Sequence, residues 1–382
     1  MANATTKSLP RAPSDRVVMW TVFLLSAFGV VAVYSAVGFL AETKAGGDTE
    51  RFLFRHVVRV GLALGVAGLL SVVDYRRLAR VSKLALALSI GLLLAVQVMG
   101  AVTNGAQRWI ELGPITFQPS DVAKVALILH VAVLLARKQD YIGDLKRGLV
   151  PLLVWIVPTL LLIGMEDLST AAVVGLTVGT MLFIGRVRIL HLASLALVGA
   201  VLAFAFLASS PQRAARLEAY LGTSLFSHTD EAQVFNAQDE GYQADQARIA
   251  FAMGGLVGVG SGKSVQRDFL PAAYNDFILA IIAEEYGLVG ATLVLLVFAW
   301  FLIRGFLRIA KDAPDPLGLF LATGLTVAVA LYGFVNAAVA CGLMPVTGLA
   351  MPFVSYGGTS LLATGAMIGI LLNISRHVQP TS

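Results

Sequence analysis

One set of charged side chains lies in the short polar stretches between the long apolar runs of this sequence, or inside those runs near their edges. They are the carboxylates Asp121, Asp167, Asp276 and one of Glu284 and Glu285, with the cations Arg108, Lys124, Arg248, Lys263 and Arg267. Such a set suits an anionic substrate anchored in a membrane, because cations stabilise a phosphate-type leaving group as charge develops on it. A neighbouring carboxylate can act as general base toward an attacking hydroxyl. The spacing does not identify which carboxylate would react.

Several of these residues also have a simple structural interpretation. Asp121 and Lys124 follow Pro119, which is well placed to start a helix, and their i, i+3 spacing lets them pair on one face. Asp167 and Asp276 each stand just before an apolar run, where a carboxylate can cap the free amides of a helix. For both aspartates, capping and chemistry remain alternatives at this point.

Glu284 and Glu285 are neighbours within an apolar run that follows Asp276. Adjacent side chains on a helix point about 100° apart, so the two cannot face one cavity equally. At least one of them needs a cationic or hydrogen-bonding partner. An ion pair with Lys124 or with an outer arginine is therefore an alternative to a catalytic task.

Prolines and glycines are dense near the end of the chain, at Pro345, Gly348, Pro352 and within residues 355–360, which begin with Ser355. At this density they break a helix at membrane depth. Irregular backbone is tolerated there only where it is buried or lines a polar cavity. We therefore expect this stretch to line one.

The composition requires membrane helices to position these side chains. Of 382 residues, 57% are hydrophobic and 13% are charged, with a mean hydropathy of +0.81, whereas roughly a quarter of the residues of soluble proteins are charged. Segments of about 17 to 25 apolar residues can cross a bilayer as helices. Ten segments qualify: 17–40, 57–73, 84–102, 119–136, 149–165, 168–184, 189–209, 277–303, 317–341 and 350–374. The sequence predicts an all-α integral membrane protein with ten transmembrane helices.

The distribution of Lys and Arg predicts the orientation of these spans. The N-terminal tail, the even-numbered connections and the C-terminal tail carry seventeen, whereas the short odd-numbered connections carry four. Positive charges are retained in the cytoplasm, so both termini are expected there. The predicted units are a cytoplasmic tail (1–16), a single membrane domain (17–375) with one large extracytoplasmic loop between spans seven and eight (210–276), and a second cytoplasmic tail (376–382).

Other classes of protein are disfavoured by the same sequence. Cys341 is the only cysteine, which excludes an intrachain disulfide and a thiolate metal cluster. The five histidines lack metal-ligand spacing, so no metal-binding residue is predicted. The net charge of +5 is dispersed between apolar runs and forms no stripe, so nucleic acid is not an expected partner.

A glycine-rich run at 254–264 is similar at first to a phosphate-binding loop. Val257 stands where that loop needs a glycine, and no buried strand precedes the run, so nucleotide binding is not expected. Residues 248–262 are apolar and glycine-rich, which predicts a short helix on the outer interface.

Six stretches resemble the SEDS family (shape, elongation, division and sporulation) in the same order along the chain. They are 104–109, 118–124, 167–170, 242–262, 275–287 and 345–358. The resemblance implies a ten-span peptidoglycan glycosyltransferase of the bacterial inner membrane that polymerises lipid II beside a class B penicillin-binding protein. It is strongest to the division branch, with the elongation branch close behind. It thus implies a place at the septum, among membrane lipids and other divisome proteins.

The resemblance also implies roles for particular residues. Asp276 matches the family's essential aspartate and would accept the proton of the acceptor hydroxyl as it attacks the donor sugar. Lys124, Arg108 and Lys263 would stabilise the lipid-linked pyrophosphate that leaves, with a divalent cation (Mg²⁺ or Mn²⁺) as an option. The other expected substrate-binding residues are Gln118, Asp121, Asp167, Arg248, Glu284, Glu285 and Ser355. The chain departs from the common pattern at Asp121, where many members have Glu, and at Tyr274-Asn275, which replaces His-Thr.

Two other functional classes are consistent with parts of this pattern. A lipid II flippase would also have broken helices and intramembrane acids, but transporter sites lie near the midplane within repeated halves. Here the candidate residues gather at the outer ends, and no repeat is visible. A non-enzymatic scaffold explains the hydrophobic chain but not the outer polar cluster.

Overall fold

Helices form most of the computed structural model, which describes residues 13–38, 49–99, 101–103, 106–112, 115–209, 214, 217–218, 220–221, 231–270 and 273–378. For residues 99, 101–103, 106–108, 111–112, 115 and 231–240 it describes the backbone only. The helices are α1 (Arg16–Ala36), α3 (Thr49–Val72), α4 (Tyr75–Met99), α5 (Pro119–Lys138), α6 (Val150–Glu166), α7 (Leu168–Ile184), α8 (Ile189–Ala208), α10 (Glu231–Gly254), α11 (Ile278–Arg304), α12 (Pro316–Ala340) and α13 (Thr359–Ser375). Short 3-10 turns occupy Gln139–Tyr141 and Gln266–Asp268, and π turns occupy Leu145–Leu149 and Gly305–Ala310.

Apart from α10, these helices follow the predicted spans in order. Eight of them, with their adjoining turns, are long and apolar enough to cross a membrane, and α7 and α13 are shorter apolar helices of 17 residues each. A chain built of such helices exposes apolar side chains around its whole girth, which only lipid can cover. The protein is therefore a helical membrane protein.

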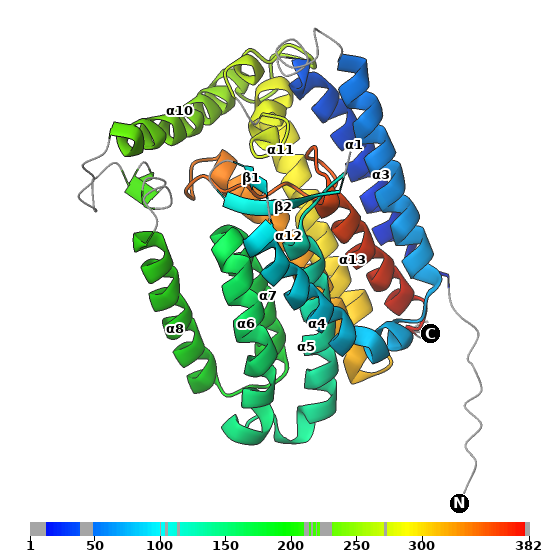
Figure 1. Cartoon of the computed structure of the whole chain (residues 1–382). Coiled ribbons are helices and arrows are strands. Elements are labelled where there is room, and N and C mark those ends of the chain that lie inside the picture. Colours follow the sequence, from blue (N-terminus) through cyan, green and yellow to red (C-terminus); the bar gives the residue numbers. More distant parts are fainter. Residues whose placement is uncertain are drawn as a thin grey trace, which may run out of the picture.

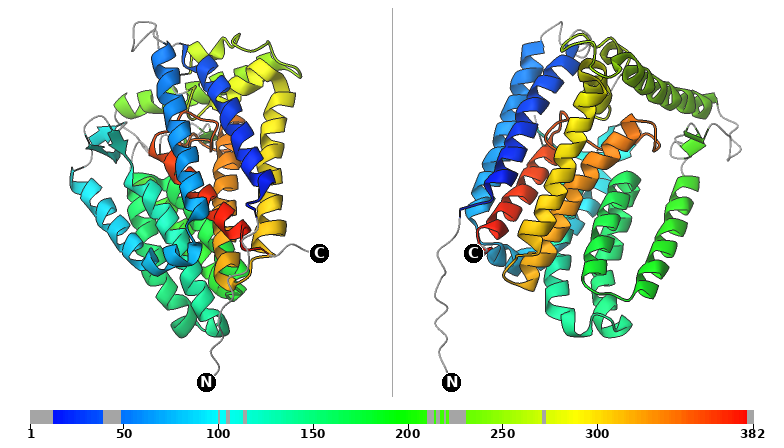
Figure 2. Two further views of the ribbon diagram at one scale, coloured as in Figure 1. Left: turned by 90° about the vertical axis from the view of Figure 1, so that its right-hand side faces the viewer. Right: turned by 180° about the vertical axis from the view of Figure 1, so that it is seen from behind.

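The helices pack around α5 and α12, whose apolar stretches are each 78% buried. α12 contacts α5, α7, α11 and α13, and α13 also lies along α3 (Figure 1). α8 stands at the edge of the bundle, and none of its residues is buried against the described chain (Figure 2). α10 crosses one end of the bundle, transverse to the other helices (Figure 1).

Polar contacts tie the helices together at the end remote from α10. The Asp15 carboxylate caps α1 and forms an ion pair with Arg304 at 2.9 Å, and its amide donates to Ser375 Oγ at 3.0 Å. Asp315, at the start of α12, accepts hydrogen bonds from Tyr75 Oη at 2.7 Å and from Arg76 Nη2 at 2.7 Å. Burial by itself raises the pKa of the Asp315 carboxyl, but these hydrogen bonds and one from an α12 amide outweigh it and hold that pKa below its ordinary value.

The connection before α5 differs from the expected polar loop. It forms a three-stranded antiparallel sheet of β1 (Ala101–Thr103), β2 (Ala106–Leu112) and β3 (Ile115–Phe117). The outer two strands have three residues each, which is too short for an alternating pattern to predict them. The all-α prediction therefore holds for the membrane part and misses this sheet.

The last predicted span, 350–374, becomes helical only at Thr359. Pro352, Gly357 and Gly358 interrupt the stretch before it, and Phe353 has a φ of 61°, a conformation that no helix contains. The predicted break is thus confirmed, although the break lies inside the predicted span.

The prediction of a helix over 248–262 is confirmed only as far as Gly254, where α10 ends, and is wrong for residues 255–262. Gly255, Gly258, Gly260 and Gly262 all have positive φ, which no right-handed helix allows. Residues 254–260, called the glycine turn below, instead pack on α11 at its kink, where Gly287 has φ 70° and ψ −172°.

Backbone hydrogen bonds join the glycine turn to both sides of this kink. They run from Val259 N to Glu284 O at 2.9 Å, from Gly260 N to Glu285 O at 3.0 Å, from Leu288 N to Gly255 O at 2.9 Å and from Val289 N to Leu256 O at 3.2 Å. A broken helix leaves amides and carbonyls without intrahelical partners, and these bonds supply partners within a long apolar helix.

Candidate active site

A cavity of about 120 Å³ lies at the end of the bundle where α5, α7 and α13 begin. Its wall includes five of the predicted site residues: Gln118, Asp121, Lys124, Asp167 and Ser355. They come from three distant stretches of the chain, which the fold brings to one place. Residues 348–358 supply most of the remaining wall, so the expectation that the proline- and glycine-rich stretch lines a cavity is confirmed.

The predicted pairing of Asp121 and Lys124 is confirmed. Lys124 Nζ donates to Asp121 Oδ1 at 2.7 Å, and the two residues are 3% and 5% exposed. Thr359 Oγ1, at the start of α13, donates to Asp121 Oδ2 at 2.6 Å. The ammonium also lies 4.5 Å from the centre of the Tyr332 ring on α12, so the pair joins three helices.

Asp167 has the capping role that its position suggested. Its Oδ1 accepts the amides of Ser169 at 2.9 Å and of Thr170 at 3.1 Å, and Thr170 Oγ1 donates to Oδ2 at 3.1 Å. The carboxylate thus fixes the start of α7 while it lines the cavity.

Asp276 lies beside the cavity, one residue after Asn275, which lines it. Asn336 Nδ2 donates to the Asp276 carbonyl at 3.0 Å and to the Leu349 carbonyl at 2.8 Å. Ser355 Oγ donates to the Asn275 carbonyl at 2.6 Å. These bonds tie the backbone around Asp276 to α12 and to the cavity wall.

The side chain of Asp276 is half-buried, and α11 begins two residues later with Phe277 as its N-cap residue. Tyr274 is linked through its carbonyl to the Tyr356 amide at 2.9 Å. Burial, and next the negative charge of Asp276, raises the pKa of the Tyr274 phenol. Asp276 therefore lies close enough to the Tyr274 phenol to act on it electrostatically.

The other predicted residues lie elsewhere. Glu284 and Glu285 are 0% and 2% exposed, and both accept hydrogen bonds from the protein instead of lining the cavity among the described residues. Lys263 is exposed on the loop after the glycine turn, and Arg248 pairs with Asp245 on α10 at 3.2 Å. Arg108 is on β2, and its side chain lies outside the described residues.

A divalent cation was an option in the sequence. Within the described ranges, no group of three or more His, Cys, Asp or Glu side chains could hold one. The carboxylate oxygens of Asp121 already accept hydrogen bonds from Lys124 and Thr359, and the Asp167 carboxylate accepts the amides at the start of α7. The described residues therefore do not fit a metal site.

Comparison with known proteins identifies the family of this chain. The profile of the family described as cell cycle protein, which includes FtsW, RodA and SpoVE, matches residues 15–380. The chain belongs to this SEDS family. It is 37% identical over 369 residues to the probable peptidoglycan glycosyltransferase FtsW of Geobacter sulfurreducens, which covers 96% of each chain. It is 36% identical over 367 residues to stage V sporulation protein E of Bacillus subtilis, which covers 95% of this chain and 97% of that protein.

Solved structures of SEDS proteins have the same fold. The crystal structure of the rod shape determining protein RodA of Thermus thermophilus matches with a TM-score of 0.68 at 28% identity, covering 96% of this chain and 98% of that one. A chain from a structure described as the structural coordination of polymerization and crosslinking by a peptidoglycan synthase complex matches with a TM-score of 0.75 at 28% identity, covering 95% of this chain and 98% of that one.

Two residues that shape the site of this SEDS chain were missed in the sequence. Tyr332 lines the cavity beside Lys124, and Asn336 holds the carbonyl of Asp276. They stand four residues apart on α12, hence on one face of an otherwise apolar helix. Polar residues at that spacing within a span are a signal of function that the sequence did contain.

Proposed function

We propose that this chain is a peptidoglycan glycosyltransferase that polymerises lipid II at the outer face of the bacterial inner membrane. Family membership and the printed activity of its FtsW relatives support the reaction. The observation that carries the proposal is the bonding of residues 274–276 to the wall of the cavity that contains Lys124. These bonds attach the backbone that carries the Asp276 carboxylate to the cavity whose wall contains the buried ammonium of Lys124.

In the proposed reaction, the Asp276 carboxylate takes the proton of an acceptor sugar hydroxyl. The hydroxyl oxygen forms a bond to the anomeric carbon of the donor as the bond from that carbon to the lipid pyrophosphate breaks. The pyrophosphate leaves with the electron pair, and the charge of Lys124 stabilises it. Because Lys124 is paired with Asp121, its ammonium offers the substrate an N–H donor in a fixed direction. Thr359 of α13 holds the Asp121 carboxylate, and the Tyr332 ring of α12 lies against the ammonium.

The remaining predicted roles are part of this proposal in a narrower form. Gln118 and Ser355 are placed on the cavity wall to contact substrate. Arg108, Arg248 and Lys263 would meet the anionic substrate outside the cavity, because the two described side chains among them are exposed. No step is assigned to a metal ion.

The proposed topology has ten crossings in one membrane domain over 17–375, with the loop 210–276 outside and both termini in the cytoplasm. The Lys and Arg distribution supports it. Asp15 and Ser375 meet at the end of the bundle opposite the cavity, in agreement with termini on one side.

We propose further that the chain acts in division at the septum, with a class B penicillin-binding protein and other divisome proteins, since several relatives are named FtsW.

Polymerisation is tested with purified protein, lipid II and detergent or vesicles, with and without the cognate penicillin-binding protein. Glycan strands are expected from the parent and not from Asp276→Asn, with both proteins equally folded. Strands from Asp276→Asn at the parent's rate would remove the proposed base. Depletion in cells separates the two branches, because loss of a division enzyme gives filaments and loss of an elongation enzyme gives round cells.

The kink of α11 at Gly287 is consistent with a flippase, since transporters use discontinuous helices. Vesicles with lipid II on one leaflet distinguish this function. Movement of lipid II across the bilayer without polymer formation would show that the chain is a transporter and not a glycosyltransferase.

A further inference from the structure

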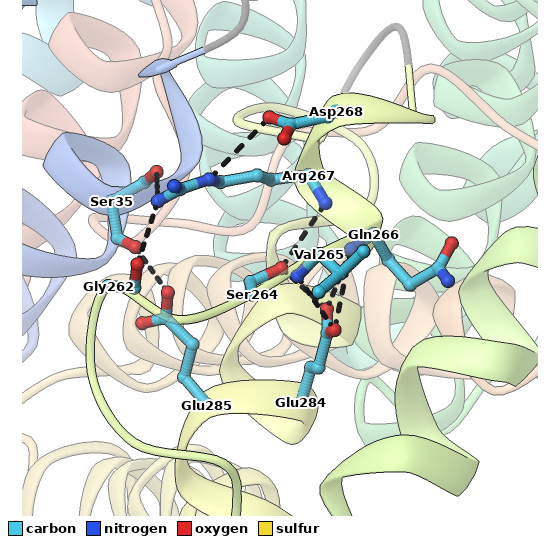
Figure 3. Close-up of polar contacts among 9 residues, drawn as sticks. All are labelled: Ser35, Gly262, Ser264, Val265, Gln266, Arg267, Asp268, Glu284 and Glu285. Carbon is cyan, nitrogen blue, oxygen red and sulfur yellow. Dashed lines mark hydrogen bonds and ion pairs between the residues drawn. The ribbon is translucent and has the colours of Figure 1, made fainter.

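The tandem carboxylates Glu284 and Glu285 have no part in the reaction proposed above, although they are buried near the outer end of α11. Figure 3 shows Glu285 beside Ser35 of α1 and Glu284 against the turn at residues 264–266. Two buried carboxylates at adjacent positions are costly unless hydrogen bonds compensate them. Each of the two has such bonds, to a different partner element.

Glu284 accepts hydrogen bonds from the start of the 266–268 turn. Val265 N donates to its Oε1 at 2.9 Å, Gln266 N donates to its Oε2 at 3.2 Å, and Ser264 Oγ donates to Oε2 as well. Ser264 Oγ in turn accepts the amide of Arg267 at 3.2 Å. A single carboxylate thus organises the backbone of four successive residues.

Glu285 binds on the other side, to α1. Ser35 Oγ donates to Glu285 Oε1, and the Ser35 carbonyl accepts a hydrogen bond from Arg267 Nη1 at 3.2 Å. Arg267 Nη1 also donates to the Gly262 carbonyl at 3.1 Å. The loop after the glycine turn is therefore fixed both to α11, through Glu284, and to α1, through Arg267.

The segment that runs from this loop to Asp276 includes residues 271–272, which lie outside the described residues. Its far end is held to α12 and the cavity wall by Asn336, Ser355 and Tyr356, as described above. Its near end is held by Glu284, and the carboxylate can reach that end because the glycine turn supports the kinked helix beneath it. A Cβ on Gly258 would lie 2.1 Å from the Glu285 carbonyl oxygen, so only glycine permits this approach.

We infer that Glu284 and Glu285 are positioning residues, which fix the loop at 262–270 against α11 and α1 and thereby set where Asp276 stands relative to the cavity. The inference rests on the proposed role of Asp276. It assigns a task to both glutamates and to the glycine turn, none of which lines the cavity among the described residues. A displacement of about 1 Å at a reacting group lowers a rate by up to about a hundredfold, so loss of the anchor is expected to reach the chemical step.

The test uses the full chain in detergent with its cognate penicillin-binding protein, and compares Glu284→Ala, Glu284→Gln and Val265→Ala. Glu284→Ala removes the acceptor of all three donors. Glu284→Gln keeps one acceptor oxygen for the two amides and loses the negative charge. Val265→Ala is the matched control, because it trims an exposed side chain and leaves the amide that donates to Glu284. Steady-state polymerisation against lipid II concentration, its pH profile, and hydrogen exchange of the peptide spanning 264–270 are measured for each.

The expected result is that Glu284→Ala lowers kcat by about tenfold or more with little change in KM, and speeds exchange at 264–270. Glu284→Gln is expected to keep most of the rate that Glu284→Ala loses, and the acidic limb of its pH–rate profile is expected to match that of the parent. Val265→Ala is expected to behave as the parent. The milder variant Ser264→Ala, which removes one donor, gives an intermediate exchange rate and covers the case in which Glu284→Ala does not fold.

Three results would overturn the inference. They are an unchanged kcat in Glu284→Ala, a kcat in Glu284→Gln as low as in Glu284→Ala with a shifted acidic limb of the pH–rate profile, or parental exchange at 264–270 in both Glu284→Ala and Ser264→Ala. If the parent itself makes no polymer, the proposed function fails, and the exchange measurement alone decides whether Glu284 anchors the loop.

Discussion

Removal of one partner from the buried pair of Asp121 and Lys124 gives the sharpest test of the site's energetics. Breaking such a pair costs about 3 to 5 kcal/mol, because an uncompensated charge stays buried. In Lys124→Met, Asp121 keeps the hydrogen bond from Thr359 at 2.6 Å, which puts the cost near the lower figure of about 3 kcal/mol. In Asp121→Ala, the partner that Lys124 keeps among the described residues is the Tyr332 ring, so the cost is expected near about 5 kcal/mol.

The assay is unfolding of the purified protein in one detergent, followed by tryptophan fluorescence. Lys146→Met is the matched control, since Lys146 is an exposed lysine. The double variant Asp121→Asn with Lys124→Met removes both charges and is expected to be more stable than Lys124→Met alone, although it lacks the cation and makes no polymer. A parental midpoint for Lys124→Met, or a double variant less stable than Lys124→Met, would refute a buried, coupled pair.

Three further predictions concern packing, pH and charge. Gly29→Ala is expected to lower the unfolding midpoint and the activity, because its Cβ would lie 2.3 Å from the Phe353 carbonyl oxygen, whereas Gly91→Ala, with nothing within 4 Å, keeps or raises the midpoint. The pKa of the Asp315 carboxyl is lower in the folded protein than in the unfolded chain, where it is about 3.9. Asp315 therefore stabilises the folded protein fully at pH values above about 3.9, and this stabilisation is lost as the pH falls through the lowered pKa. Unfolding midpoints measured from neutral to acidic pH should thus fall less in Asp315→Asn than in the parent. Gly358→Asp is expected to raise the KM for lipid II above that of Gly358→Ala. Both variants replace the same glycine and so change the backbone alike, but only Asp adds a negative charge to the cavity wall. Equal KM values would contradict this.

The sequence predicts the membrane helices well because their signal is local. Length and hydropathy locate α1, α6, α7 and α8 to within a few residues, and the i, i+3 spacing of Asp121 and Lys124 predicts their ion pair. The starts of α3 and α4 are less predictable. Both begin eight or nine residues before the predicted spans, within charged stretches that hydropathy excludes.

The parts that were not predicted depend on contacts between distant segments. The glycine run at 254–264 reads as a flawed nucleotide loop or a short helix, yet its glycines are needed because Gly254 and Gly258 approach the backbone of α11 too closely for any Cβ. Contacts between distant segments also explain why the sequence placed the tandem glutamates among the substrate-binding residues. Their partners, Ser35 and residues 264–266, are identified only when the chain is folded.

The helix starts at the cavity give a reason, independent of resemblance, to expect an anionic ligand there. Helices α5, α7 and α13 all begin there, and the amides at a helix start carry the positive end of the helix dipole. Asp167 caps α7 with its carboxylate, but the N-cap residues of α5 and α13, Gln118 and Gly358, make no side-chain cap. The N-cap side chains therefore add no negative charge at the starts of α5 and α13, which line the cavity together with the ammonium of Lys124. The positive ends of these helix dipoles and the ammonium favour a negatively charged group such as a pyrophosphate over a neutral one. The polarity of the cavity therefore favours the leaving group of the proposed reaction, in which Asp276, next to Asn275 of the cavity wall, is the proposed base on the attacking side.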